Sequence, residues 1–231
     1  MATRPNRELK IGEIIDKTIG VLSLAAVPAL IFIVVIAGLS AALDMFAQQM
    51  TTPGVVPNSG MLLQTLALTL LLLVVAFVGS YLLVETMLKR TGLMSYTGDR
   101  RILAFVGMSL LSALGVAGGF ILLIIPGLIF MARWTVAGPL LIGKGERITA
   151  ALGKSWQMTK GHEFPIIVAL LLIMIVFYGL SYAPTLLFGQ LTPVLAVIAR
   201  LASTAGSAVG AAMGIAIYGI LNTRDAGQVF E

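Results

Sequence analysis

Two arginines lie inside long apolar runs of the sequence, and they are the residues with the clearest capacity for chemistry. With a helical rise of 1.5 Å per residue, Arg133 and Arg200 would each lie roughly 10 Å from the external end of a span. An arginine at mid-span costs at least ~2.5 kcal/mol on insertion scales, so it normally faces water or a partner. No acidic residue lies deep in an apolar run. We therefore expect neither guanidinium group to have an acidic partner embedded in the membrane.

The hypothesis that follows is an anion-binding site. Both guanidinium groups, together with Trp134, are predicted to face an externally open, hydrated crevice and to bind a phosphate or carboxylate head group. In the alternative interpretation they bind no ligand. Each side chain then snorkels to the outer interface, or bonds to backbone carbonyls near Pro126 and Pro139.

Other signals for catalysis are incomplete. Residues 152–155 end like a phosphate-binding P-loop, but Ile148 stands where that motif requires glycine. His162 is the one histidine, and no second histidine follows it at the spacing of a zinc protease. The chain has no cysteine, and hence no thiolate ligand or cysteine nucleophile. The sequence therefore predicts no catalytic residue, no metal site and no cofactor, in a protein that is not an enzyme.

The composition indicates a membrane protein. Of 231 residues, 58% are hydrophobic and 11% are charged, and the mean hydropathy is +1.02. Soluble domains are roughly half apolar and a quarter charged, and a chain of this size cannot bury such an excess in one core. The net charge of +5 would suit nucleic acid, but the basic residues flank the apolar runs and form no single stripe. We predict contact with anionic lipid and none with nucleic acid.

Six apolar runs are long enough to cross ~30 Å of hydrocarbon as helices. We predict an all-α integral membrane protein whose six transmembrane helices form three hairpins, with amphipathic interfacial helices on the cytoplasmic side. Residues 102–142 are either one kinked span or two with a turn at Pro126-Gly127, and two spans keep all cations on one side. The fourth span is short, so it either crosses fully or is re-entrant. The predicted spans are residues 27–45, 61–84, 102–125, 127–142, 164–188 and 193–221.

Charge predicts the orientation, with both termini in the cytoplasm. All Lys and Arg outside the spans fall on one predicted side. The external connections, at 44–60, at Pro126-Gly127 and at 189–192, contain none. Residues 1–26 are not predicted to be a secretory signal, because charged residues occupy the place of its apolar region.

Two cytoplasmic segments have the apolar periodicity of helices that lie in the interface plane. One is residues 9–22, within the segment 1–26, and the other is residues 145–160, inside the membrane domain 27–231. Gly161 is expected to end the second helix in a left-handed conformation. The polar face of the first helix is formed by Lys10, Glu13, Asp16 and Lys17.

Small residues recur every four positions in the sixth predicted span, and a second such site lies in the third. Small side chains let two helix backbones approach closely in lipid. The stripe is expected either to pack helices of one chain together or to form a homodimer seam. The residues are Ala202, Gly206, Gly210 and Gly214 in the sixth span, and Gly115 and Gly119 in the third.

The order of several motifs resembles a known family. An Ile-Pro-Gly sequence at Pro126-Gly127 is followed by Arg133-Trp134, and then by Ser155-Trp156 and Thr159-Lys160-Gly161. This pattern resembles the membrane-domain family named after glycerophosphoryl diester phosphodiesterases, together with the related YciC-like bacterial inner-membrane proteins. The resemblance implies a polytopic helical fold and a location in a bacterial inner membrane. Phosphodiesterase activity belongs to a separate soluble domain in some members, and we do not expect it here.

These observations favour a polytopic inner-membrane protein without catalytic machinery, which binds lipids or a partner protein in envelope or lipid homeostasis. The partners expected are membrane lipids with anionic head groups, and a second protein or a second copy at the small-residue stripe. A first alternative is a transporter or flippase for an anionic lipid-like molecule, with Arg133 and Arg200 at its external mouth. A second alternative is a membrane-embedded enzyme that acts on lipid.

Overall fold

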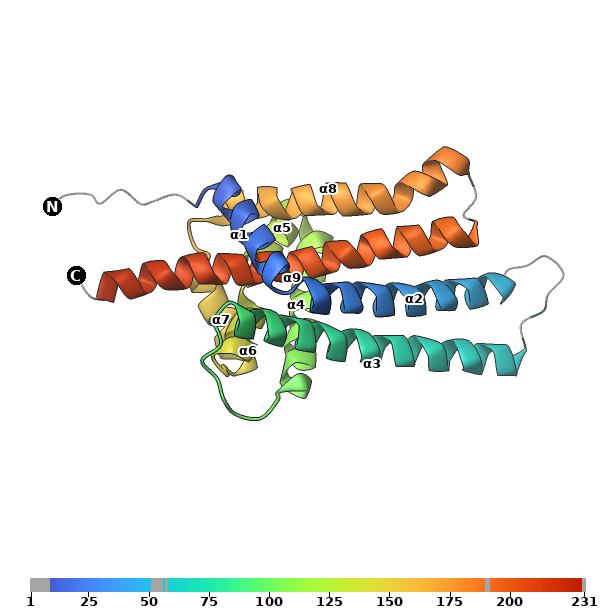
Figure 1. Cartoon of the computed structure of the whole chain (residues 1–231), viewed down its shortest axis with the longest axis horizontal. Helices are drawn as coiled ribbons and strands as arrows, with labels where there is room; N and C mark the ends of the chain where they lie inside the picture. The colour runs from blue at the N-terminus through green and yellow to red at the C-terminus, as the bar shows by residue number, and fades with distance from the viewer. Residues whose placement is uncertain (1–8, 51–55, 57, 190–191, 230–231) are drawn as a thin grey trace. The chain divides into compact units, whose positions relative to one another are not determined.

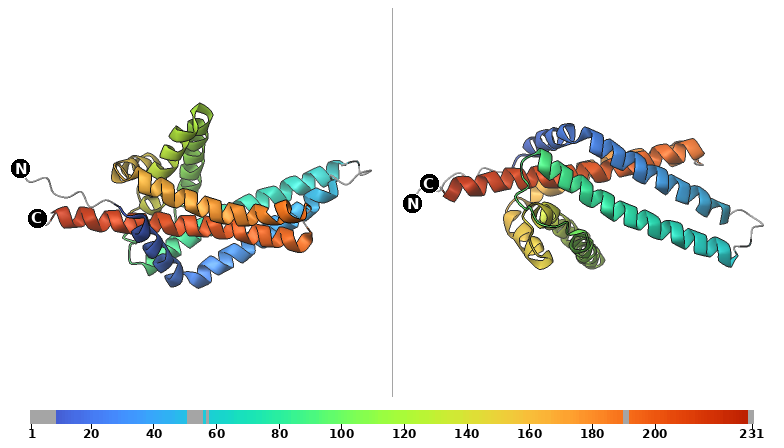
Figure 2. Two further views of the ribbon diagram at one scale, coloured as in Figure 1. Left: turned by 90° about the horizontal axis from the view of Figure 1, so that it is seen from above. Right: turned by 60° about the horizontal axis from the view of Figure 1, so that its bottom comes forward.

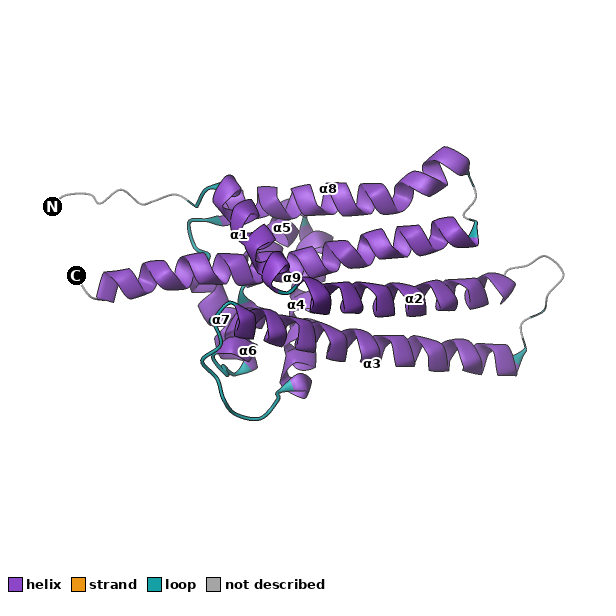
Figure 3. Ribbon diagram, viewed as in Figure 1, coloured by secondary structure: helices purple, strands orange, loops and turns teal. Residues whose placement is uncertain are grey.

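The computed structural model describes residues 9–50, 56, 58–189 and 192–229. This part of the chain is helical and has no β-strand, so the predicted all-α class is confirmed (Figure 1, Figure 3). Parts of the predicted N-terminal segment and external connections, residues 1–8, 51–55, 57 and 190–191, lie outside the described residues. The helices are α1 (Ile11–Leu24), α2 (Ala26–Met50), α3 (Ser59–Arg90), α4 (Ile102–Leu122), α5 (Ile124–Trp134), α6 (Ala137–Gly143), α7 (Ile148–Met158), α8 (Glu163–Phe188) and α9 (Pro193–Val229).

Short polar residues and glycine define several helix ends. The side chain of Asn58 accepts a hydrogen bond from the amide of Met61 at 2.9 Å, which caps α3. The hydroxyl of Thr192 accepts one from the amide of Leu195 at 3.4 Å, at the start of α9. Gly161 follows α7 with φ of +85°, so the predicted left-handed helix end is confirmed.

Six helical stretches within the described residues are long and apolar enough to cross a membrane. Apolar side chains run along these helices with few charges, which is the composition that a hydrocarbon solvent requires. The stretches are Ala26–Met50, Ser59–Arg90, Ile102–Leu122, Ile124–Gly143, Glu163–Leu187 and Val194–Asn222.

The predicted turn at Pro126-Gly127 is wrong. The chain leaves helix at Leu123, whose backbone is extended (φ −167°, ψ 157°), and α5 begins at the next residue. Pro126 therefore lies in the first turn of α5, where its missing N–H removes no helical hydrogen bond. The predicted fourth span is also interrupted, because α5 ends at Trp134 and α6 begins at Ala137.

The chain folds as two compact units. The first comprises Met1–Ala25, Val84–Leu172 and Gly210–Glu231, and the second comprises Ala26–Leu83 and Ile173–Val209. Helices α3, α8 and α9 each contribute residues to both units, so the two ends of each of these helices pack against different residues.

The core of the first unit surrounds α6. Every residue of this short helix except Gly138 is buried. Its last carbonyl, that of Gly143, accepts hydrogen bonds from the amides of Ser95 and Tyr96 at 2.9 and 2.8 Å. The guanidinium group of Arg101 donates to the carbonyls of Gly145 and Glu146. These bonds satisfy carbonyls at a helix end and attach the connection between α3 and α4 to α6.

Helices α4 and α5 approach closely at two glycines, and Figure 2 shows them side by side in green. A Cβ atom on Gly119 would lie 2.9 Å from both the Cα atom of Gly127 and a ring carbon of Phe130. One turn earlier, a Cβ atom on Gly115 would meet the indole of Trp134. The two helices pack this tightly because neither glycine has a side chain.

The second unit also packs its helices on small residues. A Cβ atom on Gly206 of α9 would lie 2.8 Å from the Cβ atom of Phe177 of α8. The hydroxyl of Ser181 on α8 donates to the carbonyl of Ala199 on α9 at 3.0 Å. Gly79 of α3 has a similar relation to the ring of Phe32 on α2, with a closest distance of 3.2 Å.

Helix α1 buries one face and exposes another. Ile14, Thr18 and Val21 are buried in the first unit, whereas Ile15 and Ile19 are exposed. An exposed apolar row beside a buried one fits a helix in contact with lipid on its outer side. That α1 lies in the interface plane stays a prediction.

Adding one methyl group to Gly119 is expected to destabilise the protein. The Gly119→Ala substitution forces the backbone of α5 away from α4, at a cost of about 1–3 kcal/mol. The matched control is Gly118→Ala, since a Cβ atom there meets nothing within 4 Å and alanine favours the helix by about 0.5–1 kcal/mol. Thermal unfolding in detergent measures both. Equal melting temperatures for the two variants would contradict this account of the α4–α5 contact.

Candidate functional site

Arg133, next to the last residue of α5, inserts its guanidinium group between α7 and the first residue of α8. Its Nη1 donates to the carbonyl of Trp156 at 3.0 Å, and its Nη2 forms an ion pair with Glu163. The Cζ atom lies 5.1 Å from the ring centroid of Trp156, which is a cation–π distance. Arg133 is only 8% exposed. A charge this buried is costly unless it is paired, so these contacts stabilise Arg133 in its place.

The backbone carbonyl of Arg133 is also bonded, by two hydroxyls of α7 and its end. Ser155 donates to it at 2.6 Å and Thr159 at 3.3 Å. Carbonyls in the last turn of a helix have no helical donor, and α5 stops one residue later. Ser155 and Thr159 lie four residues apart on one helical face, so both reach the same oxygen. Both side chains are fully buried.

Three aromatic rings enclose this polar contact. The centroid of Phe130 lies 4.9 Å from that of Trp134 and 5.5 Å from that of Trp156. The two indole rings lie 6.4 Å apart. Tilted rings at these distances attract one another. We call Arg133, Ser155, Thr159, Glu163 and these three aromatic residues the α5–α7 lock.

Arg133 has an acidic partner, although no acidic residue lies deep within a predicted span. Glu163 lies at the start of α8, where its negative charge also meets the positive end of the helix dipole. The sequence placed this carboxylate just before a span, and only the fold brings it to Arg133. Arg133 therefore contacts the segment predicted to be cytoplasmic. Binding of an anionic head group by Arg133 and Trp134 stays a prediction, and Arg133 Nε has no hydrogen-bond partner among the described residues.

Residues 94–207 match the family model described as the membrane domain of glycerophosphoryl diester phosphodiesterase. The chain carries this family's membrane domain. The resemblance seen in the motifs is thereby confirmed over the region that holds all of them. Neither a curated protein nor a solved structure matches the chain. With six helices of spanning length, the family assignment makes this a multi-pass membrane protein.

The α5–α7 lock gives the motifs of this membrane domain a structural explanation. Arg133-Trp134 ends α5, while Ser155-Trp156 and Thr159 lie on α7 and just after it. These separate motifs meet through the hydrogen bonds and ring contacts described above. Glu163, Ser155 and Thr159 were not predicted as site residues, although the last two lie within the motif that carries the resemblance. The four-residue spacing of Ser155 and Thr159, which places both on one helical face, was the sequence feature that could have indicated them.

Arg200 also has an acidic partner, Asp44, which lies at the end of the first predicted span. In the second unit, its Nε and Nη2 atoms donate to the two carboxylate oxygens of Asp44, at 2.5 and 2.7 Å. This two-pronged geometry is the strongest form of an Arg–carboxylate pair. The Arg200 and Asp44 side chains are 45% and 30% exposed. Arg133 belongs to the first unit and Arg200 to the second, so a crevice shared by both stays a prediction.

The small residues predicted to pack helices occupy different surroundings. Gly115, Gly119 and Gly206 lie against large side chains, as described for the two units, and Ala202 is buried. A Cβ atom on Gly214 would lie 2.7 Å from the carbonyl oxygen of Thr135, at the break between α5 and α6. A Cβ atom on Gly210 would meet nothing within 4 Å. A homodimer seam at this stripe stays a prediction.

The described residues contain no group of three His, Cys, Asp or Glu side chains placed to hold a metal ion. Two further acidic residues, Glu85 and Glu146, form ion pairs near helix ends. Glu85 of α3 pairs with Lys89 and Arg100, and Glu146 pairs with Lys154. The arrangement around Arg133 is thus one of mutual stabilisation between buried groups.

Breaking the Arg133–Glu163 pair is expected to loosen the α5–α7 lock. Arg133→Gln and Glu163→Gln should each lower the free energy of unfolding by about 1–3 kcal/mol, because each leaves a partly buried charge without its partner. The double variant should lose less than the sum of the two. Unfolding in mixed micelles, followed by tryptophan fluorescence, measures all three.

The Lys154→Gln variant is the control for this cycle. Lys154 lies on α7, as Ser155 does, and pairs with Glu146 just before that helix. Because the Lys154 side chain is 53% exposed, the loss of free energy of unfolding should stay below about 1 kcal/mol. Strict additivity of the Arg133 and Glu163 variants would show that the pair contributes no coupling.

Proposed function

We propose that this membrane domain acts without covalent catalysis, as a module of a bacterial inner membrane that binds anionic lipid and supports envelope or lipid homeostasis. The α5–α7 lock supports the first part of this proposal, the absence of covalent catalysis. The polar groups of the lock bind one another. The guanidinium group of Arg133 pairs with the carboxylate of Glu163, and its backbone carbonyl accepts hydrogen bonds from the hydroxyls of Ser155 and Thr159. Side chains engaged in this way hold α7 against α5 instead of activating a substrate.

Lipid is the solvent that the exposed surface of the spans requires. Large apolar side chains such as Leu63 of α3, Leu114 of α4 and Ile175 of α8 are exposed in the structure. Exposed apolar surface on this scale is unfavourable in water and neutral in hydrocarbon. The basic residues between the spans add an attraction for anionic head groups of about 1 kcal/mol each near the membrane surface.

A transporter or flippase for an anionic lipid-like molecule is the second candidate, and the Arg200–Asp44 pair favours it. This pair joins α9 and α2, two helices of spanning length, and both side chains are partly exposed. A phosphate head group offers Arg200 the same kind of paired oxygen acceptors as the carboxylate of Asp44. The lock offers no such exchange, because Arg133 is buried.

Native mass spectrometry of the purified full chain tests the proposed function. We expect the protein to retain anionic phospholipid through gentle removal of detergent. Retention of a second protein in fixed stoichiometry, with no lipid, would contradict lipid binding. In proteoliposomes, transfer of labelled phosphatidylglycerol that Arg200→Gln slows would favour the flippase instead.

The proposed orientation has its own test. The cations of residues 143–163 should remain in the cytoplasm, because positive loops resist translocation. A phosphatase reporter fused after Lys160 should therefore be inactive, and a fluorescent protein fused there should fold and fluoresce. Phosphatase activity at this position would reverse the proposed orientation.

A further inference from the structure

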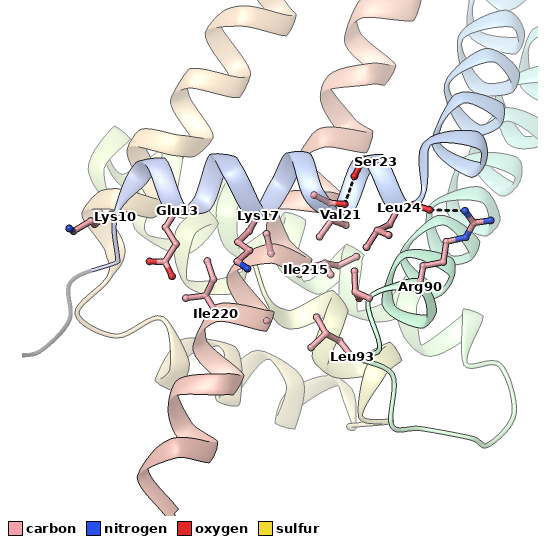
Figure 4. Close-up of a pocket in the computed structure, with 14 residues that line it drawn as sticks. Lys10, Glu13, Lys17, Val21, Ser23, Leu24, Arg90, Leu93, Ile215 and Ile220 are labelled. Atoms are coloured by element: carbon pink, nitrogen blue, oxygen red, sulfur yellow. Dashed lines mark hydrogen bonds between the residues drawn. The ribbon is translucent and has the colours of Figure 1, made fainter.

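The first unit contains a cavity of about 1100 Å³ between α1, the end of α3 and α9 (Figure 4). Lys10, Glu13 and Lys17 of α1 line it together with Arg90, the last residue of α3. Figure 4 shows Glu13 and Lys17 extending from α1 toward α9, with Arg90 at the opposite end beside Leu24. None of these residues was predicted to bind a ligand.

The polar lining is positively charged. It has three cations, of Lys10, Lys17 and Arg90, and the carboxylate of Glu13. Within the part of the chain that the structure describes, neither lysine forms an ion pair. Arg90 Nη1 donates to the carbonyl of Leu24 at 2.7 Å, and this neutral acceptor leaves the charge of the guanidinium group in place. Such a lining attracts a phosphate or carboxylate group.

The rest of the lining is apolar. It includes Val21 and Leu24 of α1, Leu93 after α3, and Ile215 and Ile220 of α9. A cavity of this size exceeds the ~300–1,000 Å³ of ordinary small-molecule sites. It therefore has room for a charged head group together with a length of hydrocarbon chain.

The cavity lies where the spanning helices end. Arg90 is the last residue of one span, and Ile215–Ile220 lie in the last two turns of another, Val194–Asn222. A single residue, Ala25, separates the end of α1 from the start of α2, the first span. Head groups occupy this level of a bilayer, while acyl chains lie beside the spans.

We propose that this cavity binds one anionic glycerophospholipid, with its phosphate near Lys17, the positive charge of Arg90 at the other end of the cavity, and the upper part of an acyl chain against Val21 and Ile215. The proposal rests on the lipid-binding function proposed above and assigns it a site. Charge selects the anionic head group, and the apolar wall selects a lipid over a soluble anion. Lys10 extends the positive charge toward the beginning of α1.

Native mass spectrometry of the delipidated full chain, titrated with phosphatidylglycerol or phosphatidylcholine, tests the site. We expect one phosphatidylglycerol to bind preferentially. The double variant Lys17→Gln/Arg90→Gln should weaken this binding about tenfold or more, since each cation contributes about fivefold. The control Arg147→Gln/Lys160→Gln removes two exposed cations elsewhere in the same unit and should change binding less than about twofold.

A second pair of variants tests the cavity without changing charge. Gly20 lines it, and a Cβ atom there meets nothing within 4 Å, so Gly20→Leu should place an apolar side chain in the cavity and weaken binding. Gly12 of α1 is equally open but does not line the cavity, so Gly12→Leu should bind as the unaltered protein does.

The outcomes separate the site from the function. If the unaltered protein binds no lipid, lipid binding itself is wrong. If it binds phosphatidylglycerol but Gly20→Leu and Lys17→Gln/Arg90→Gln bind it equally well, the cavity is not the site. Displacement of phosphatidylglycerol by inorganic phosphate at similar concentration would overturn the choice of a lipid over a soluble anion.

Discussion

The interruption between α5 and α6 leaves helix-end carbonyls inside an apolar protein, and satisfying them is the constraint on which the first unit depends. The carbonyl of Arg133 obtains its donors from Ser155 and Thr159, and its guanidinium group obtains acceptors from Trp156 and Glu163. Each of these partners comes from α7 or from the chain that follows it. The break in the span and the docking of α7 are therefore one structural feature, since neither is stable without the other.

Charged side chains in this protein either form ion pairs or lie at the ends of spans, where head groups surround them. Arg133 and Arg200, the two cations inside apolar runs, each meet a carboxylate, and Glu85 meets two cations at the end of α3. Pairing lowers the free-energy cost of burying an ion away from water. The surrounding apolar side chains have no such cost, because hydrocarbon is a favourable solvent for them. The cations that line the cavity beside α1 follow the same rule, because they lie at the ends of spans.

The proposed lipid site changes the interpretation of residues that first indicated only topology. Lys10, Glu13 and Lys17 were predicted to form the polar face of an interfacial helix. In the structure they line a cavity whose opposite wall is α9. A cation near the membrane surface can both orient the chain and bind a head group, because the same attraction for negative charge serves both. Structure and topology thus assign compatible roles to these side chains.

The all-helical class and the six apolar stretches were predictable from the sequence, because length and hydropathy decide both without reference to other residues. Local chemistry also sufficed for the end of α7 at Gly161. The partners of Arg133 and Arg200 were not predictable, since Asp44 and Arg200 are separated by 156 positions and no local pattern connects them. The interruption after Trp134 depended likewise on the donors that the carbonyl of Arg133 finds in Ser155 and Thr159. Those pairings, and the cavity between α1 and α9, exist only once distant segments pack together.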